Sequence, residues 1–176
     1  MCSSDLFASK THPHRYNVFM KPRVYVETSV ISYLTARPSR DLIVAAHQEL
    51  TREWWRGASE HFDLLVSEFV YEEAAKGDAG AAQERLRLLE NLPEIGVDER
   101  CQTLAQALLS RGALPQQALY DALHVAVCAV NQVDILVTWN CKHIANVTMY
   151  NLIDDVCRQA GYIAPRICTP VELWGM

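Results

Sequence analysis

The sequence predicts an α/β domain of three layers, in which a central, mostly parallel sheet of four to five strands lies between helices. Short apolar runs, of which residues 24–26 and 135–137 are the clearest, have the near-continuous hydrophobicity of strands that are covered on both faces. Longer segments with apolar residues at helical spacing separate these runs. Strands that alternate with helices favour a parallel, doubly wound sheet.

The composition fits one globular unit, because half of the 176 residues are hydrophobic and a chain of this length can bury a sizeable core. The six cysteines are spread singly, so we expect reduced thiols and a cytoplasmic protein. No apolar run approaches the roughly 20 residues of a membrane helix, so no membrane partner is expected. The net charge of −5 argues against a broad basic surface for nonspecific nucleic-acid binding. It fits either an ordinary solvated surface or a cluster of acids that holds cations.

Residues 1–22 have no usable apolar periodicity, and we expect them to form an N-terminal extension that is either disordered or non-native. Met20 is an alternative start. Residues 23–176 then make up the folded domain. His12 and His14 are expected to belong to a solvated arm and not to a metal site.

Each element follows from apolar periodicity and from the residues that begin and end helices. The strands are expected near residues 24–26, 64–66, 95–97, 135–138 and 166–169. The helices are expected near residues 30–36, 41–56, 67–75, 81–92, 98–112, 116–131 and 144–161.

Capping and breaking residues set the helix ends in the first half of the chain. Pro38 ends the first helix, and Asp41 caps the second. Ser67 is the expected N-cap of the third helix, which stops at Gly77, and Pro93 ends the fourth. The expected buried stripe of the second helix consists of Leu42, Ala45, Ala46, Leu50 and Trp54.

In the second half, Asp98 opens a helix that ends at Gly112, and Pro115 starts the next helix. The expected buried stripe of that helix consists of Leu119, Leu123, Val127 and Val130. The last strand precedes Pro170 and is expected at an edge of the sheet.

Acidic side chains stand in apolar surroundings at three places. Glu27 directly follows the first strand, where ligands gather at the carboxyl ends of parallel strands. Glu72 and Glu73 lie on the helix after the second strand, and Asp121 interrupts an apolar helix. An acid in such a helix costs desolvation free energy unless it is paired or bound to a cation. For Asp121 an ion pair or a local hydrogen bond is the alternative to a ligand role.

Four segments resemble the successive motifs of the PIN-domain family, which includes the VapC-like toxins of type II toxin–antitoxin pairs. They follow the order of the family from about residue 23 to residue 172. The segments are VETSVIS at 26–32, VSEFVYEE at 66–73, YDALH at 120–124 and LVTWNCKH at 136–143.

The resemblance implies a metal-dependent ribonuclease whose carboxylates converge at the carboxyl edge of the sheet and bind Mg²⁺ or Mn²⁺. Carried over by position, Glu27, Glu73 and Asp121 are the implied ligands, and Glu27 stands where the family usually has an aspartate. A cation there would polarise a phosphodiester and lower the pKa of a water that attacks in line. Glu72 is the alternative to Glu73, because adjacent helical residues point about 100° apart and only one can face the site.

Asn140 departs from the family pattern, since many members carry another aspartate at this catalytic position. An amide offers a carbonyl oxygen to a cation but brings no charge and does not act as a base. Asp134 is no substitute, because it begins the strand and lies about 15 Å away at the opposite edge of the sheet.

Several polar residues near these acids have open roles. Thr28 and Ser29 are expected to support the site or contact phosphate, or else to form a turn hydrogen bond. Lys142 and His143 are expected to contact phosphate or to belong to a solvated turn. His124 lies one helical turn after Asp121, and it either touches the site or is a core histidine bonded to backbone.

The sequence therefore predicts an endoribonuclease that acts on RNA, with a cognate antitoxin as its protein partner and a homodimer as a possible assembly. Because the chain is acidic, its affinity for RNA would come from the metal and from local basic residues such as Arg37, Arg40, Lys142 and His143. The alternative is a catalytically weak PIN-like module that binds RNA or protein. Asn140 and the absence of a basic face suggest this alternative.

Overall fold

The computed structural model describes residues 20–173, and within this range four strands, all parallel, form one sheet in the order β2-β1-β3-β4. The strands are β1 (Arg23–Val26), β2 (Asp63–Leu65), β3 (Ile135–Val137) and β4 (Arg166–Cys168). The predicted parallel α/β fold is confirmed, with the sheet at the lower end of the expected four to five strands.

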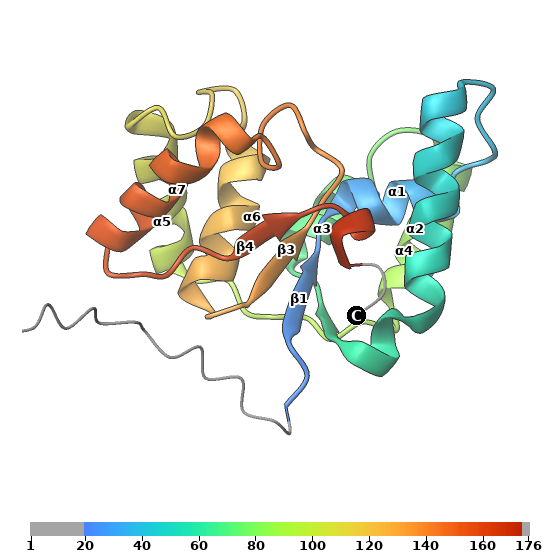
Figure 1. Ribbon diagram of the computed structural model, residues 1–176, viewed down its shortest axis with the longest axis horizontal. Helices are drawn as coiled ribbons and strands as arrows, with labels where there is room; N and C mark the ends of the chain where they lie inside the picture. The colour runs from blue at the N-terminus through green and yellow to red at the C-terminus, as the bar shows by residue number, and fades with distance from the viewer. Residues whose placement is uncertain (1–19, 174–176) are drawn as a thin grey trace, which may run out of the picture.

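Helices cover both faces of this sheet. In Figure 1, α5, α6 and α7 lie together on one side, and α1, α2 and α4 lie on the other. On that second side α1 packs against α2, α3 and α4. The helices are α1 (Thr28–Thr35), α2 (Leu42–His61), α3 (Glu68–Ala74), α4 (Ala79–Leu89), α5 (Glu99–Ser110), α6 (Leu119–Val130), α7 (Val147–Gln159) and the short 3-10 helix η1 (Pro170–Leu173).

The strand register brings the carboxyl ends of the inner strands side by side. Tyr25 of β1 lies opposite Leu65 of β2 and Leu136 of β3. The pairing continues past the strand end, since the N–H of Glu27 donates to the carbonyl of Val137 over 3.1 Å. The chain switches sides of the sheet at β1, and ligands of such folds bind outside the carboxyl ends at the switch point.

Asp134 lies at the opposite edge of the sheet, as the sequence predicts. Its Oδ2 accepts the N–H of Arg23 at 2.8 Å, and its carbonyl accepts the N–H of Arg166 at 2.9 Å. Asp134 therefore ties together the starting ends of β1, β3 and β4, far from the carboxyl edge.

The helix α6 is buried on every side, because residues 122–130 are all buried. It begins at Leu119 and not near Pro115, since Ala118 has a non-helical backbone and its N–H closes a turn onto the carbonyl of Pro115. Leu119, expected in the buried stripe, is 48% exposed at the helix start. Because residues on every face of this helix are buried, its apolar residues do not form one stripe that periodicity could identify.

Aspartate and asparagine side chains cap several helices. The expected caps Asp41 and Asp98 accept backbone N–H groups of α2 and α5, and Asp78 and Asn146 do so for α4 and α7. Ser67 occupies the N-cap position of α3 as expected, but its side chain makes no capping bond. Its hydroxyl is instead bonded to the phenol of Tyr25 at 2.7 Å.

The prediction for the buried face of α2 is confirmed at Trp54 only, since Ala45 and Leu50 are partly buried and Leu42 and Ala46 are exposed. The buried residues of this helix are Gln48, Thr51, Trp54 and Ala58, and Leu42 is 86% exposed. Two polar residues face inward because their hydrogen bonds are satisfied there. The amide of Gln48 bonds the backbone of the preceding loop, and the Thr51 hydroxyl donates to the His47 carbonyl of the same helix and accepts the indole N–H of Trp139. The helix also continues to His61, five residues beyond the expected end near residue 56.

The predicted strand over residues 95–97 is also absent from the described sheet. The chain there forms one isolated parallel bridge, between Val66 and Glu94, with the N–H of Ile95 bonded to the carbonyl of Val66 at 2.8 Å. The remaining helices begin or end within about three residues of the expected positions, which is the usual scatter of helix ends.

Most of the predicted N-terminal extension, including His12 and His14, lies outside the described residues, which begin at Met20. The domain division at residue 22 therefore stays a prediction. Among the described helices, none combines the length and the apolar character needed to cross a bilayer.

The orientation of α2 can be tested by comparing two alanine substitutions. Leu42→Ala should change the free energy of unfolding by less than about 0.5 kcal/mol, because the side chain is solvated. Trp54→Ala should lower it by about 3–5 kcal/mol, because a buried indole is lost. Urea unfolding followed by circular dichroism measures both values. A loss of several kcal/mol for Leu42→Ala would contradict this orientation and favour the stripe expected from the sequence.

Candidate functional site

Glu27 lies at the carboxyl end of β1, where its side chain also caps α1. The residue is 6% exposed, and its carboxylate accepts three hydrogen bonds. The donors are the Ser29 N–H at 3.1 Å, the Ser29 hydroxyl, and the Thr138 hydroxyl at 2.7 Å. All three donors are neutral, so they hold the carboxylate in place without cancelling its charge.

Glu73 projects from α3 towards the same edge. Its Oε2 accepts the Thr28 hydroxyl at 2.8 Å and lies 2.8 Å from Nε2 of His124. Burial is the largest influence on the Glu73 carboxyl, and it raises the pKa. The hydrogen bond and the charge of His124, together with the hydrogen bond from Thr28, lower the pKa by more, so it falls below its ordinary value. Glu73 is therefore ionised at neutral pH.

Glu72 points elsewhere, because adjacent residues of a helix face different directions. It is exposed, and its Oε2 accepts the hydroxyl of Tyr120 at 2.9 Å. Of the two neighbouring acids, Glu73 is the one beside Glu27.

His124 is fully buried on α6, and it is bonded to side chains and not to backbone. Its Nδ1 lies 2.7 Å from the hydroxyl of Tyr25, which in turn is 2.7 Å from the hydroxyl of Ser67. Burial raises the pKa of Tyr25 well above its usual value, so the phenol stays protonated. A buried chain of hydrogen bonds thus runs from Ser67 through Tyr25 and His124 to Glu73.

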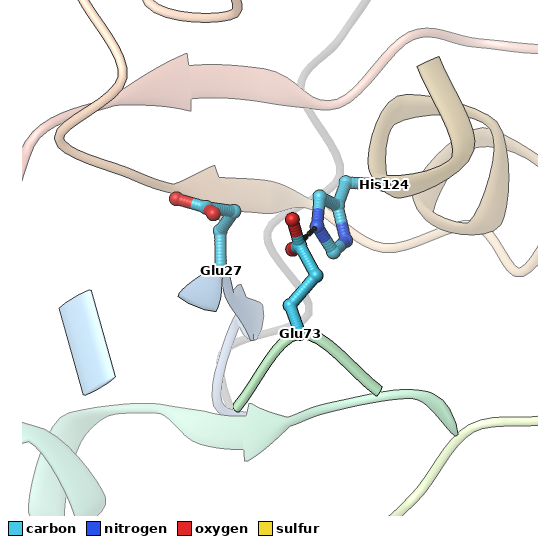
Figure 2. Close-up of side chains that lie close together, drawn as sticks. All are labelled: Glu27, Glu73 and His124. Atoms are coloured by element: carbon cyan, nitrogen blue, oxygen red, sulfur yellow. Dashed lines mark hydrogen bonds and ion pairs between the residues drawn. The ribbon is translucent and has the colours of Figure 1, made fainter. Parts of the chain in front are cut away.

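Glu27, Glu73 and His124 converge from three different elements, with the Glu73 carboxylate between the other two side chains (Figure 2). One potential ligand atom from each residue lies within 4.8 Å of those of the other two, the one such group of three or more among the described residues. Two carboxylates and an imidazole fit a divalent cation, because they combine hard oxygen donors with a nitrogen donor and carry surplus negative charge.

Asp121, a predicted ligand, lies beside this cluster but is not part of it. Its Oδ1 accepts the side-chain amide of Asn140 at 3.0 Å, and its Oδ2 lies 2.7 Å from Nδ1 of His143. The Asn140 N–H donates to the Thr138 hydroxyl at 2.9 Å, and that hydroxyl donates to Glu27. Asp121 is thus linked to the cluster through two intermediate residues.

The amide of Asn140 has a structural explanation. It donates to Asp121, while its own carbonyl oxygen accepts the N–H of His143 at 3.2 Å. An aspartate at this position would place two carboxylates in contact, which requires a shared proton or a cation. The amide makes the contact favourable without either.

The two hydroxyls after Glu27 are engaged with the acids. Thr28 donates to Glu73, and Ser29 donates to Glu27 while it accepts the N–H of Trp139 at 2.8 Å. Lys142 differs, since it is exposed and its side chain makes no hydrogen bond or ion pair with the described part of the chain.

Sequence reasoning left the role of His124 open and missed the part that Tyr25 plays. A signal for both was present. His124 follows Asp121 by three residues, which puts the two on one helix face, and Tyr25 carries a hydroxyl into an otherwise apolar strand. A buried phenol needs a hydrogen-bond partner, but the sequence does not indicate which residue supplies it.

The fold and the site together define an α/β domain with an acidic centre at the carboxyl edge of a parallel sheet. The model of the PIN domain family matches residues 24–142, so the chain belongs to the PIN domain family. The family predicted from the four motifs is therefore confirmed.

Among solved structures, a similar one is the crystal structure of VapBC2 from Rickettsia felis bound to a DNA fragment from their promoter. The two chains superpose with a TM-score of 0.52 and are 15% identical, over 83% of this chain and 97% of the other. Similarity at this level of identity demonstrates a shared fold. No curated protein matches the sequence.

Removing the Tyr25 hydroxyl tests the buried chain behind His124. Tyr25→Phe should lower the free energy of unfolding by about 1–3 kcal/mol, because Ser67 and His124 lose their partner in a dry environment. Tyr162→Phe is the control, since the Tyr162 hydroxyl has no hydrogen bond to the described residues, and it should change the value by less than about 0.5 kcal/mol. Equal effects in urea unfolding would show that the chain of hydrogen bonds adds no stability.

Proposed function

We propose that this protein is a metal-dependent endoribonuclease that hydrolyses RNA phosphodiester bonds with Mg²⁺ or Mn²⁺, as the toxin of a type II toxin–antitoxin pair. The observation that carries the proposal is the convergence of Glu27, Glu73 and His124 at the carboxyl edge of a PIN-domain sheet. Family membership would not be enough to support a metal-dependent nuclease if this cluster were missing.

Glu27, Glu73 and His124 are the proposed ligands of the cation, with Asp121 as a further ligand at the rim. The bound cation would polarise a phosphate and lower the pKa of water. Carboxylates suit both Mg²⁺ and Mn²⁺, whereas an imidazole nitrogen favours Mn²⁺, the softer of the two. We therefore expect the site to prefer Mn²⁺.

The hydroxyls around the acids orient them for this role. Thr28 fixes Glu73, while Ser29 and Thr138 fix Glu27, so both carboxylates keep their places in the absence of a cation. Outer hydrogen bonds of this kind orient ligands and tune their affinity for the metal.

Tyr25 gives His124 two possible arrangements of protons. When the phenol donates to Nδ1, Nε2 carries the proton and donates to Glu73. When the phenol donates to Ser67, Nδ1 carries the proton and Nε2 presents a lone pair to a cation. Preparing the imidazole as a ligand therefore takes two changes, a turn of the buried phenol hydroxyl from Nδ1 to Ser67 and a change of tautomer in which Nε2 gives up its proton and Nδ1 gains one.

A cognate antitoxin is the proposed protein partner. The support comes from the shared fold, since the similar structure is that of VapBC2 bound to a DNA fragment from their promoter.

A second function is a binding module of low catalytic activity. The contact of Asn140 with Asp121 favours it, because this contact occupies one oxygen of an implied metal ligand with a neutral donor. The two functions differ in whether metal loading produces cleavage.

The neighbouring acids of α3 provide a matched test of metal binding. Glu73→Gln should weaken Mn²⁺ binding at least about tenfold in calorimetric titration, because a charged ligand is lost. Glu72→Gln removes the same charge one residue away and should leave the affinity unchanged, since Glu72 faces Tyr120. Equal losses in both variants would indicate a diffuse electrostatic effect and would contradict the proposed ligand.

Cleavage is tested with purified protein, a labelled pool of total RNA, and either Mn²⁺ or EDTA. The wild type and Glu72→Gln should produce discrete fragments with Mn²⁺ alone, whereas Glu73→Gln and Asp121→Asn should not. If the wild type binds Mn²⁺ and leaves the RNA intact, the nuclease proposal fails and the binding module is favoured.

A further inference from the structure

Three ring side chains gather beside the acidic centre. The His47 ring stacks on Trp139 with the ring centroids 4.1 Å apart and the planes 18° from parallel. Tyr33 meets Trp139 edge-on at 5.9 Å and lies 6.0 Å from His47. The rings come from α1, α2 and the segment after β3, and all three are only partly buried, so they expose part of their surface. We name these residues the ring cluster.

The ring cluster is fixed relative to the acids. Trp139 follows Thr138, which donates to Glu27, and the N–H of Trp139 donates to the same Ser29 hydroxyl that donates to Glu27. The indole N–H donates to the buried hydroxyl of Thr51 at 2.7 Å. The rings and the carboxylates therefore keep one geometry with respect to each other.

A loop with two arginines connects the helices that carry Tyr33 and His47. The buried amide of Gln48, 3% exposed, donates to the carbonyl of Arg37 at 3.0 Å and accepts the N–H of Ser39 at 2.9 Å. Burying this amide is costly unless both of its ends are bonded, and here the loop backbone satisfies both. Gln48 thus gives the loop a defined conformation.

The guanidinium groups on this loop have no described partner. Arg37 and Arg40 are exposed, and neither side chain forms a hydrogen bond or an ion pair with any residue from 20 to 173. By contrast, Arg52, Arg56, Arg87, Arg100 and Arg158 form ion pairs with nearby acids. In a chain with a net charge of −5, two unpaired cations on a fixed loop are a local feature of the surface.

We propose that the ring cluster stacks a nucleobase of single-stranded RNA, while Arg37 and Arg40 hold the phosphates beside it. This inference rests on the proposed function and adds the form of its substrate. Exposed aromatic surface binds bases of any sequence by stacking, and guanidinium groups bind phosphate oxygens in pairs. The base must be unstacked to reach the rings, which excludes a regular duplex.

The position of the ring cluster links base binding to the reaction. Trp139 and Glu27 share Ser29 as a hydrogen-bond partner, so a nucleotide seated on the ring cluster would lie next to the acidic centre. The subsite would therefore set which phosphodiester enters the acidic centre. Tyr33, His47 and Trp139 are accordingly proposed as positioning residues and not as catalytic ones.

Binding in EDTA separates this inference from the nuclease proposal, because no cleavage is possible. The probe is a short fluorescent oligouridylate, measured by anisotropy beside an oligomer of equal charge with abasic sites. His47→Ala should weaken binding of the oligouridylate about tenfold and leave the abasic oligomer unchanged. His47→Phe keeps a ring and should restore binding. His61→Ala, on the same helix, is the matched control and should bind as the wild type does.

The arginines should act on both probes alike. Arg37→Gln and Arg40→Gln should each weaken binding of the oligouridylate and of the abasic oligomer. Each should also reduce the slope of log affinity against log salt concentration by about 0.7 for every phosphate that the variant no longer neutralises. Arg100→Gln, which removes an ion-paired arginine, is the control for charge and should have no such effect.

Three results would overturn the stacking subsite, even if the protein cleaves RNA with Mn²⁺. The first is equal binding of the oligouridylate by wild type and His47→Ala. The second is a weakening by His47→Ala that is the same for both probes, and the third is the absence of any binding by the wild type. If the binding pattern in EDTA is as expected but the wild type does not cleave RNA in Mn²⁺, the result supports the stacking subsite and contradicts the nuclease proposal.

Discussion

The buried carboxylate of Glu27 is the constraint around which the carboxyl edge of the sheet is organised. A charged group at 6% exposure needs donors, and they come from Ser29 and Thr138, which are far apart in the sequence. Each of these hydroxyls also accepts a backbone N–H, from Trp139 and Asn140 respectively. One carboxylate thus fixes the start of α1 and the whole turn after β3.

The helix α6 supplies the other half of the site. Its first turn carries Asp121, where the helix dipole favours a negative charge, and His124 follows one turn later in full burial. Because residues 122–130 of α6 are all buried, His124 is fixed by the core around it, whereas Asp121 lies in the partly exposed first turn and is held by its bonds to Asn140 and His143. The helix thus contributes one member to each of two acid–histidine pairs, Glu73 with His124 and Asp121 with His143.

Sequence patterns predict the structure correctly where a local rule decides it. The apolar runs of β1 and β3, the caps Asp41 and Asp98, and the acid at the end of β1 all follow from such rules. The patterns failed where a polar side chain faces inward. Gln48 and Thr51 define the buried face of α2, and Ser67 and His124 meet at Tyr25, yet their partners lie up to 99 residues away. Counting apolar residues finds a buried face only when that face is apolar.

Asn140 links these observations to the metal chemistry. Its amide gives Asp121 a permanent neutral donor, so the Asp121 carboxylate needs no cation to be stable beside the turn. An asparagine instead of an aspartate at position 140 also leaves this edge of the sheet with one negative charge fewer, which weakens any cation site that depends on Asp121. Glu27, Glu73 and His124 do not depend on it, since their supporting bonds come from Ser29, Thr28, Thr138 and Tyr25. These contacts fit the proposed centre of one cation, in which the imidazole of His124 lies beside the carboxylates of Glu27 and Glu73 and Asp121 lies at the rim.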